Sequence, residues 1–490
     1  MKNNHAETPL YDALINYGLK QNTIPFDVPG HKFGKAIPQR FKDDVGEAIF
    51  KIDVNSMQEL DSLSNPIGVI KEAEALAADL FQASKAFFLV NGSTSGVQKM
   101  ILSTCTDQDK LILPRHIHKS AFNAVVLSGA RPIYIDPIYD EESGIAMGIR
   151  FEDVKETIDK NPDAKAILLL HPNYFGFTSD AKRIIDYAHE HGIAVLADQS
   201  HGSHFSLHEG YPKSAIELGA DLATISMHKT GGSLSQSSIL LYNSKLISYT
   251  RVRSTINLFQ TSSASYLLLA SLDIARSNLA MNKDALFTKT LALAEKASLA
   301  ISRIPGFKIV NRDKVDGDAI FAHDSTKLTI DIGDFGFSGF HVYDYFKKHY
   351  NIQLELGESH VVLAIISIGD SDHSIDALIN ACEDFSRTHK STSRYRGKTL
   401  PLETPPMRLT PREAFFKESV LIDINHALGR ISADSIMIYP PGIPLVTPGE
   451  EITKKVIEHY SYYVKESSIV IGSHEKNETI YIKVLKEDAQ

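Results

Sequence analysis

The sequence predicts an α/β protein in which a mainly parallel sheet is followed by smaller α+β parts. Three observations predict this class. Short, nearly continuous apolar runs alternate with stretches of helical periodicity, as buried parallel strands joined by helices do. The chain has 490 residues, too many for one hydrophobic core. After about residue 300, apolar residues begin to alternate with polar ones, which is typical of half-exposed strands.

Composition excludes several functional classes. Apolar residues make up 43% and charged residues 23%, and the formal net charge of −9 argues against a nucleic-acid or anionic-membrane protein. No run approaches the roughly 20 apolar residues of a membrane span, and the N-terminus lacks the apolar core of a signal peptide. Cys105 and Cys382 lie in apolar or helix-like stretches, so we expect buried thiols rather than disulfides. These features predict a cytoplasmic protein.

The chain is expected to begin with an amphipathic helix over about 7–24, and the large part follows the N-terminal arm. The expected strands of the large part cover residues 87–90, 111–113, 132–135, 166–170, 194–197, 222–225 and 238–242. Helices are expected between them, for example over 119–128 and 180–191. Only a short loop precedes the run at 238–242, which allows that strand to be antiparallel.

Two helices are expected next, one over 261–275 with a hydroxyl-rich start and a long one over about 283–303. Beyond them the chain changes character. Strands are expected at 327–332 and 361–368, and helices at 340–350 and 373–386. Residues 387–400 are basic and rich in hydroxyl groups, as in a linker. In a third part, the prolines within 437–446 predict a rigid loop rather than a helix or a central strand. The predicted organisation is an N-terminal arm (1–60), a large domain (61–300), a small α+β domain (301–390) and a C-terminal domain (391–490).

A candidate phosphate site follows the first expected strand. Residues Ser93, Thr94 and Ser95 lie between the strand and a helical pattern that begins near Val97. Free backbone N–H groups at a helix start, together with hydroxyl groups, bind anions. The same residue types also serve as ordinary helix caps, and no Gly-Lys-Ser/Thr sequence makes this a P-loop.

Polar residues gather where other expected strands end. His118, His171, Asp198 and Lys229 each follow such a run, and ligands of parallel sheets bind outside the carboxyl ends of the strands. Core packing does not explain four such residues, although a single lysine or aspartate there could be a surface residue or a helix cap.

These residues together match the needs of pyridoxal 5′-phosphate. Lys229 would bind the aldehyde as a Schiff base, and Asp198 would pair with the pyridine nitrogen. His118 or His171 would lie against the ring, while Ser226 and His228 flank the lysine and could add contacts. No metal site is expected, because the histidines near residues 201–208 lack the spacing and companions of a zinc motif.

The sequence resembles the Orn/Lys/Arg decarboxylases over nearly its whole length. The resemblance rests on Asp-Val-Pro-Gly-His-Lys at 27–32, Ser-Met-His-Lys at 226–229, Gly-Gly-Ser-Leu-Ser-Gln-Ser-Ser at 231–238, Tyr-Pro-Pro-Gly-Ile-Pro at 439–444 and Pro-Gly-Glu at 448–450. It implies a fold-type I, aspartate aminotransferase-like large domain with a mainly parallel seven-stranded sheet. The length resembles the short form found in Gram-positive bacteria.

The resemblance also implies roles for single residues. Lys229 would carry the cofactor, Asp198 would bind the ring nitrogen, His118 would stack on the ring and His201 would lie near its phenolic oxygen. Ser93, Thr94 and Ser95 would hold the phosphate. Ser226 and His228 would assist them. In place of the Asp-Glu-Ala-His common in the family, this chain has Asp-Gln-Ser-His at 198–201. That departure leaves the fine tuning of the site open.

The resemblance implies decarboxylation of a basic amino acid, foremost L-arginine to agmatine in polyamine biosynthesis. Lysine, ornithine or an aminopropylated agmatine are alternative substrates, and an aminotransferase or β-eliminating lyase would use the same lysine and aspartate. The substrate's distal cation needs an acidic partner, and the candidates are Asp27, Glu59, Asp61, Glu355, Glu358 and Glu451. A homodimer or a higher homo-oligomer with shared active sites is expected, with residues 261–263 and the loop at Pro440 completing a neighbour's site.

Overall fold

The computed structural model describes residues 4–389, 404–439, 443–465, 469–476 and 479–486. The chain divides into two compact units, the first formed by 1–103 and 196–288 and the second by 104–195 and 289–490. The main sheet has seven strands in the order β1-β8-β7-β6-β4-β2-β3. β8 pairs antiparallel with both of its neighbours, β1 and β7. The other described pairs, β2 with β3, β2 with β4 and β6 with β7, are parallel. The prediction of a mainly parallel seven-stranded sheet is confirmed.

The strands of the first unit explain why its polar residues share one edge. They are β1 (Lys85–Leu89), β8 (Ser238–Tyr242), β7 (Leu222–Ile225) and the end of β6 (Ala194–Asp198). β8 runs antiparallel to both β1 and β7, which confirms the antiparallel strand that the short loop allowed. β6 pairs in parallel with β7. Because β8 is antiparallel to both β1 and β7, these two strands run in the same direction as each other and as β6. The three strands therefore end at the same edge of the sheet.

One helix, which begins in the first unit, is longer than expected. α12 (Tyr266–Ile301) is a single 36-residue helix where two helices were expected, because no glycine or proline interrupts it before Pro305. The expected helix at 7–24 is a shorter α1 (Pro9–Ile15) followed by a π-helical turn, Asn16–Lys20. The remaining helices of the first unit are α2 (Gln39–Val45), α3 (Ala48–Lys51), a 3₁₀ turn (Gln58–Leu60), α4 (Val69–Leu80), α5 (Gly92–Thr104), α9 (Ala215–Leu218), α10 (Met227–Thr230) and α11 (Tyr249–Leu258).

A buried carboxylate anchors the N-terminal helix to α12. Asp273 Oδ2 accepts hydrogen bonds from the backbone N–H groups of Leu10 (3.0 Å) and Tyr11 (3.2 Å), which are unpaired donors in the first turn of α1. Its other oxygen pairs with Arg276 at 2.7 Å, and both side chains are fully buried. Arg276 also donates to the backbone oxygen of His5. The N-terminal segment is therefore fixed to its own unit by paired polar groups.

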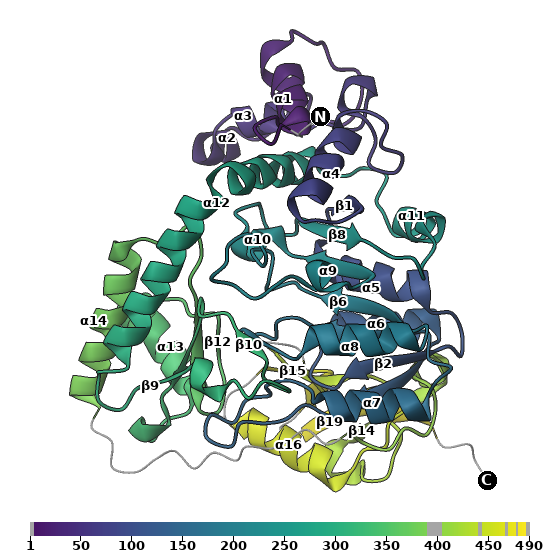
Figure 1. The fold of residues 1–490 in the computed structure, drawn as a ribbon, viewed down its shortest axis with the longest axis vertical. Helices are drawn as coiled ribbons and strands as arrows, with labels where there is room; N and C mark the ends of the chain where they lie inside the picture. The colour runs from purple at the N-terminus through teal and green to yellow at the C-terminus, as the bar shows by residue number, and fades with distance from the viewer. Residues whose placement is uncertain (1–3, 390–403, 440–442, 466–468, 477–478, 487–490) are drawn as a thin grey trace. The chain divides into compact units, whose positions relative to one another are not determined.

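The second unit contains the remaining strands of the main sheet and a smaller sheet. β4 (Ala166–Leu170), β2 (Lys110–Pro114) and β3 (Arg131–Ile135) are joined by α6 (Lys119–Ser128), α7 (Phe151–Lys160) and α8 (Ala181–Glu190). Short strands β5 (Phe177–Thr178) and β10 (Ala322–His323) pair antiparallel. The small sheet has the order β12-β13-β11-β9, with bounds Leu356–Gly357, Val361–Ile365, Lys327–Asp331 and Lys308–Val310. Helices α13 (Gly339–Tyr350) and α14 (Asp372–Thr388) are drawn in green in Figure 1. Their buried side chains share an apolar core with this sheet.

The C-terminal part of the second unit is built from two three-stranded sheets. One has the order β14-β19-β18 (Ser419–Asp423, Thr479–Leu485, Ser473–Lys476), and the other β16-β15-β17 (Ile443–Val446, Ile436–Tyr439, Ile469–Ile471). Helices α15 (Pro411–Phe416) and α16 (Lys454–Lys465) accompany them, and the unit's 3₁₀ turns are Arg312–Lys314, Gly333–Phe335 and Ile424–His426.

The proline-rich stretch at 437–446 is only partly the loop that we predicted. Its first residues lie in β15, which is the central strand of its sheet, so the expectation that no central strand forms there was wrong. Pro444 lies in β16 at the edge, where a residue without an N–H group is tolerated. The prolines that carry the loop prediction, Pro440 and Pro441, lie outside the described residues.

A buried ion pair connects the C-terminal sheets to the strands of the second unit. Arg115, just after β2, donates to both carboxylate oxygens of Glu450 at 2.6 and 2.8 Å, and the two side chains are no more than 1% exposed. Glu450 also accepts from the backbone N–H of Thr447 at 2.7 Å. Breaking one half of such a pair leaves a buried charge without a partner, which costs several kcal/mol.

Both cysteines, Cys105 and Cys382, are buried as expected. Within the part of the chain that the structure describes, no helix combines the length and apolar character that crossing a membrane requires.

Replacing Glu74 by glutamine is expected to remove a pH dependence of stability. Glu74 on α4 is buried and accepts the Phe88 backbone N–H of β1 at 2.9 Å. Burial raises its pKa from 4.5 to about 7, despite Arg253 nearby. The folded state therefore holds a proton that the unfolded chain releases, so this stabilisation is full below pH 4.5 and is lost as the pH rises through 7.

Urea unfolding at about pH 5 and about pH 7.5 checks this expectation. The wild type should lose roughly 2 kcal/mol more over that interval than Glu74→Gln does. The control is Glu72→Gln on the exposed side of the same helix, which should keep the wild-type profile. Identical profiles for wild type and Glu74→Gln would contradict the assignment.

Candidate active site

Lys229 lies directly beyond a buried strand, where the sequence placed it. All four residues of β7 are buried, Ser226 follows them, and Lys229 belongs to the short helix α10. Its Nζ atom lies 2.7 Å from Nε2 of His201. An ammonium group has no acceptor, so this contact needs one unprotonated nitrogen, either on the imidazole or on the amine. The arrangement disfavours two positive charges side by side, which favours a reactive amine.

The contact arises from the pairing of β6 with β7. Asp198 ends β6 and lies opposite Thr224 in the parallel ladder. The chain after each strand therefore emerges at the same level, and Gln199 continues the ladder with an N–H bond of 3.0 Å to the Thr224 oxygen. One loop carries His201 and the other Lys229. Further bonds join the same loops, since Thr230 Oγ1 lies 2.6 Å from Ser203 Oγ and 3.1 Å from His204 Nδ1.

Asp198 is buried at this edge and is held through one oxygen. Its Oδ1 atom accepts hydrogen bonds from the backbone N–H of Ser200 at 3.2 Å and from the Ser200 hydroxyl group. Within the described residues, no donor reaches Oδ2. A carboxylate with one oxygen engaged and one available fits the partner of a protonated ring nitrogen.

The predicted phosphate loop forms the first turn of α5, after β1. Ser93 Oγ lies 2.6 Å from Ser226 Oγ, so hydroxyl groups from the ends of two strands meet. Ser95 donates to the Gly92 carbonyl oxygen at 3.0 Å, which is a local helix contact, and Thr94 is exposed. A Cβ atom on Gly96 would lie 2.1 Å from Thr224 Oγ1, so only glycine lets α5 approach β7 this closely.

His228 has a defined tautomer. Its Nδ1 atom lies 2.9 Å from the carbonyl oxygen of Ser237, so Nδ1 carries the proton and donates it. Burial lowers the pKa of His228, and the neighbouring Lys229 charge lowers it further. In the neutral ring Nε2 is left as an acceptor. Two further bonds within 233–237 fold this segment back toward β8.

Most predicted site residues are thus brought together within the first unit: Ser93, Asp198, His201, Ser226, His228 and Lys229. His118 belongs to the second unit, where it caps α6 by accepting the Ser120 N–H at 3.2 Å. Its stacking role stays a prediction. Among the described residues no group of histidine, cysteine and acidic side chains has the arrangement of a metal site.

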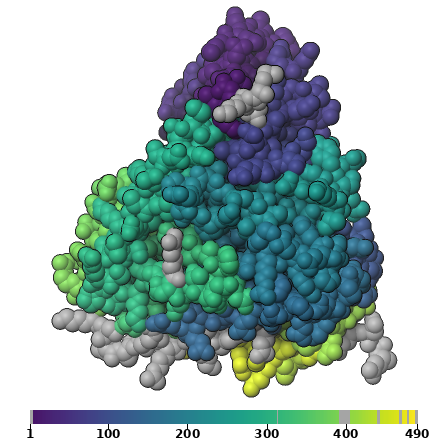
Figure 2. Space-filling view, viewed as in Figure 1, coloured from purple at the N-terminus to yellow at the C-terminus, as the bar shows by residue number. Residues whose placement is uncertain are grey.

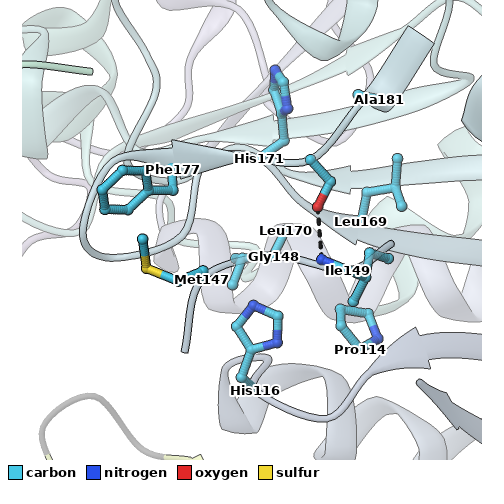
Figure 3. A pocket seen from close by; sticks show the side chains of 11 residues that line it. Pro114, His116, Met147, Gly148, Ile149, Leu169, Leu170, His171, Phe177 and Ala181 are labelled. Atoms are coloured by element: carbon cyan, nitrogen blue, oxygen red, sulfur yellow. Dashed lines mark hydrogen bonds between the residues drawn. The ribbon is translucent and has the colours of Figure 1, made fainter. Parts of the chain in front are cut away.

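His171, the other candidate for the ring histidine, lines a small cavity in the second unit. The cavity lies between the ends of β2 and β4 and residues 147–149, and His116 borders it from below (Figure 3). Ser179 Oγ accepts the Ile149 N–H there at 2.9 Å. The cavity measures about 10 Å³, which is room for one water molecule and not for an amino acid. Burial lowers the pKa of His116 to about 4, so its ring is neutral.

Sequence reasoning missed three contributors to this site. Ser200, Gln199 and Thr230 were seen only as neighbours of the predicted residues. The Asp-x-Ser spacing at 198–200 is a signal for a side chain that bonds backbone two residues on, and it could have indicated Ser200. The bonds of Gln199 and Thr230 join loops distant in sequence, which no local pattern reveals.

Comparisons with known proteins agree with this architecture. The family model described as Orn/Lys/Arg decarboxylase, major domain matches residues 8–374, and the model for the C-terminal domain of that family matches 397–468. Arginine decarboxylases of Bacillus anthracis and Bacillus subtilis (strain 168) are each 38% identical to this chain, with 98% of both chains covered. The crystal structure of a Francisella novicida lysine decarboxylase superposes with a TM-score of 0.84 at 22% identity, covering 98% of this chain and 81% of that one. The predicted fold is confirmed.

Proposed function

Because this chain belongs to the Orn/Lys/Arg decarboxylase family, we propose that it converts L-arginine to agmatine and CO2 with pyridoxal 5′-phosphate as its cofactor. Agmatine formation would serve polyamine biosynthesis. The substrate proposal is supported by the relatives named arginine decarboxylases, which match almost end to end and at higher identity than the lysine decarboxylase does. The observation that carries the chemistry is the Lys229–His201 contact beside Asp198.

The residues of the first unit fit this cofactor. Lys229 offers an amine for the aldehyde, and its contact with His201 disfavours a positive charge on both groups at once. Ser93 and Ser226 offer paired hydroxyl groups, and the start of α5 offers backbone N–H groups, for a phosphate. Asp198 Oδ2 offers an acceptor for the ring nitrogen. When bound, pyridoxal phosphate supplies an electron sink for the electron pair of the Cα–carboxylate bond, which breaks as CO2 leaves.

His201 and Lys229 would also handle protons. The amine of Lys229 would gain and lose a proton during the reaction. The 2.7 Å contact gives that amine a partner which accepts or returns a proton. Neutral His228, whose Nε2 is an acceptor, would accept a hydrogen bond from a protonated phosphate oxygen rather than donate one.

The partner of the substrate's distal cation can be narrowed to fewer residues. Asp61 is buried and accepts the backbone N–H groups of residues 62, 67 and 68, so it stabilises its own loop. Glu451 is paired with Arg408 at 2.7 and 2.9 Å. Asp27, Glu59, Glu355 and Glu358 remain candidates. Burial raises the pKa of Glu358 to about 7, so a cation would have to stabilise its charged form.

We also propose a homodimer. The N-terminal arm leaves several large apolar side chains exposed, with Phe26 at 94% and Ile24 at 75%. The arm forms surface on the first unit, coloured purple in Figure 2. Apolar patches of this kind mark association surfaces.

Equilibrium sedimentation of the wild type should give twice the chain mass. Phe26→Asp should shift the equilibrium toward the monomer, because it places a charge in the exposed apolar surface. A monomeric wild type would refute the dimer.

Lys229→Ala is expected to abolish the visible absorbance of lysine-bound pyridoxal phosphate and to lower the rate of CO2 release by at least about 10³-fold, because no other amine takes its place. Absorbance spectra and a radiometric CO2 assay of purified proteins measure both. The matched control is Lys182→Ala on the exposed side of α8, outside the proposed site, which should leave both signals near wild type. A wild type without the band would contradict the cofactor proposal.

Arginine, lysine and ornithine tested side by side decide the substrate. We expect kcat/KM for arginine to exceed that for the other two by at least about tenfold, because a guanidinium group forms paired hydrogen bonds that an ammonium group does not. Preference for lysine or ornithine would overturn the substrate proposal alone. Silence with all three would overturn the decarboxylase proposal.

A further inference from the structure

Ser200 places two donors on the same oxygen of Asp198. The backbone N–H reaches Oδ1 at 3.2 Å, and the hydroxyl group donates to that oxygen as well. Ser200 is 8% exposed and Asp198 is 3% exposed, so water competes little for these bonds. The backbone bond alone closes the turn after β6. The hydroxyl bond is additional, and it acts on the orientation of the carboxylate.

The serine itself is held in place by the residue before it. Gln199 Nε2 donates to the Gly202 oxygen at 2.8 Å, and Gln199 Oε1 accepts the Ala215 N–H at 2.7 Å. The side chain thus connects the loop 199–202 to the start of α9. A glutamate here could accept from Ala215 but would turn an oxygen toward the Gly202 carbonyl oxygen. Glutamine avoids that repulsion and keeps the loop rigid.

We propose that Ser200 is a positioning residue, whose hydroxyl group holds the Asp198 carboxylate so that Oδ2 receives the ring nitrogen of pyridoxal phosphate. The assignment rests on the proposed function. With Oδ1 doubly engaged, rotation of the carboxylate is restricted and only Oδ2 remains as an acceptor. An alanine at 200, as in the common family pattern, would keep the turn and lose this restraint.

The test measures cofactor binding to the full-length apoprotein rather than activity. Dissociation constants for pyridoxal phosphate are determined by fluorescence titration for wild type, Ser200→Ala and Ser200→Thr. A hydrogen bond to a charged group corresponds to about tenfold in affinity, so Ser200→Ala should bind about tenfold more weakly. Ser200→Thr keeps a hydroxyl group and should recover most of that loss.

A cofactor analogue separates positioning from a general effect on the loop. In 1-deazapyridoxal 5′-phosphate a carbon replaces the ring nitrogen, so Asp198 has no nitrogen to bind. Ser200→Ala should then change the affinity less than about twofold, since the restraint no longer has a partner to serve.

The outcomes distinguish this inference from the proposed function. A wild type that binds no pyridoxal phosphate would overturn both. Normal binding by wild type with an unchanged Ser200→Ala variant would overturn the role of Ser200 and leave the proposed function standing. An equal loss for cofactor and analogue would show that Ser200 only supports the loop, and that result would also overturn the inference.

Discussion

Two nitrogen atoms, Lys229 Nζ and His201 Nε2, lie 2.7 Å apart, and at that distance they cannot both carry a positive charge. The rest of the candidate site depends on this contact. It exists because two neighbouring parallel strands end at the same level, so that the loops after β6 and β7 leave the sheet side by side. Hydrogen bonds between Thr230 and both Ser203 and His204 hold the two loops together next to the pair.

The same edge of the sheet supplies the other groups. β8 is antiparallel to both its neighbours, and this brings the end of β1 level with the end of β7. Ser93 and Ser226 consequently meet, and Gly96 allows the helix after β1 to pack closely against Thr224. An acceptor for a ring nitrogen, hydroxyl groups for a phosphate and a reactive amine are therefore products of strand order, because they follow the ends of β6, β1 and β7.

Much of this could be predicted from the sequence, because its signals are local. Fully buried strands read as apolar runs, and a lysine or aspartate directly after such a run must lie at the sheet edge. The bounds of α6 and the burial of both cysteines followed from local patterns as well. The continuous α12 could also have been predicted, since no glycine or proline lies within 266–301. The hydroxyl-rich start near residue 261 was instead interpreted as a separate helix.

What the sequence could not supply are contacts between segments far apart in the chain. The Arg115–Glu450 pair spans 335 residues, and neither partner has a local signal. The six acidic candidates differ in their hydrogen bonds, since Asp61 binds backbone N–H groups of its own loop and Glu451 pairs with Arg408, and the sequence does not show these contacts. In the sequence, Ser200 is only a difference from the common family pattern. Its hydroxyl bond to Asp198, which the sequence does not show, supplies the physical reason to assign it a role.

The central claim is that the amine of Lys229 is the one that holds the cofactor. Borohydride reduction of the enzyme after incubation with pyridoxal phosphate, followed by peptide mapping by mass spectrometry, tests it most directly. The claim predicts one modified peptide, with the added mass on Lys229. Modification at another buried lysine such as Lys99, or no specific modification at all, would contradict it.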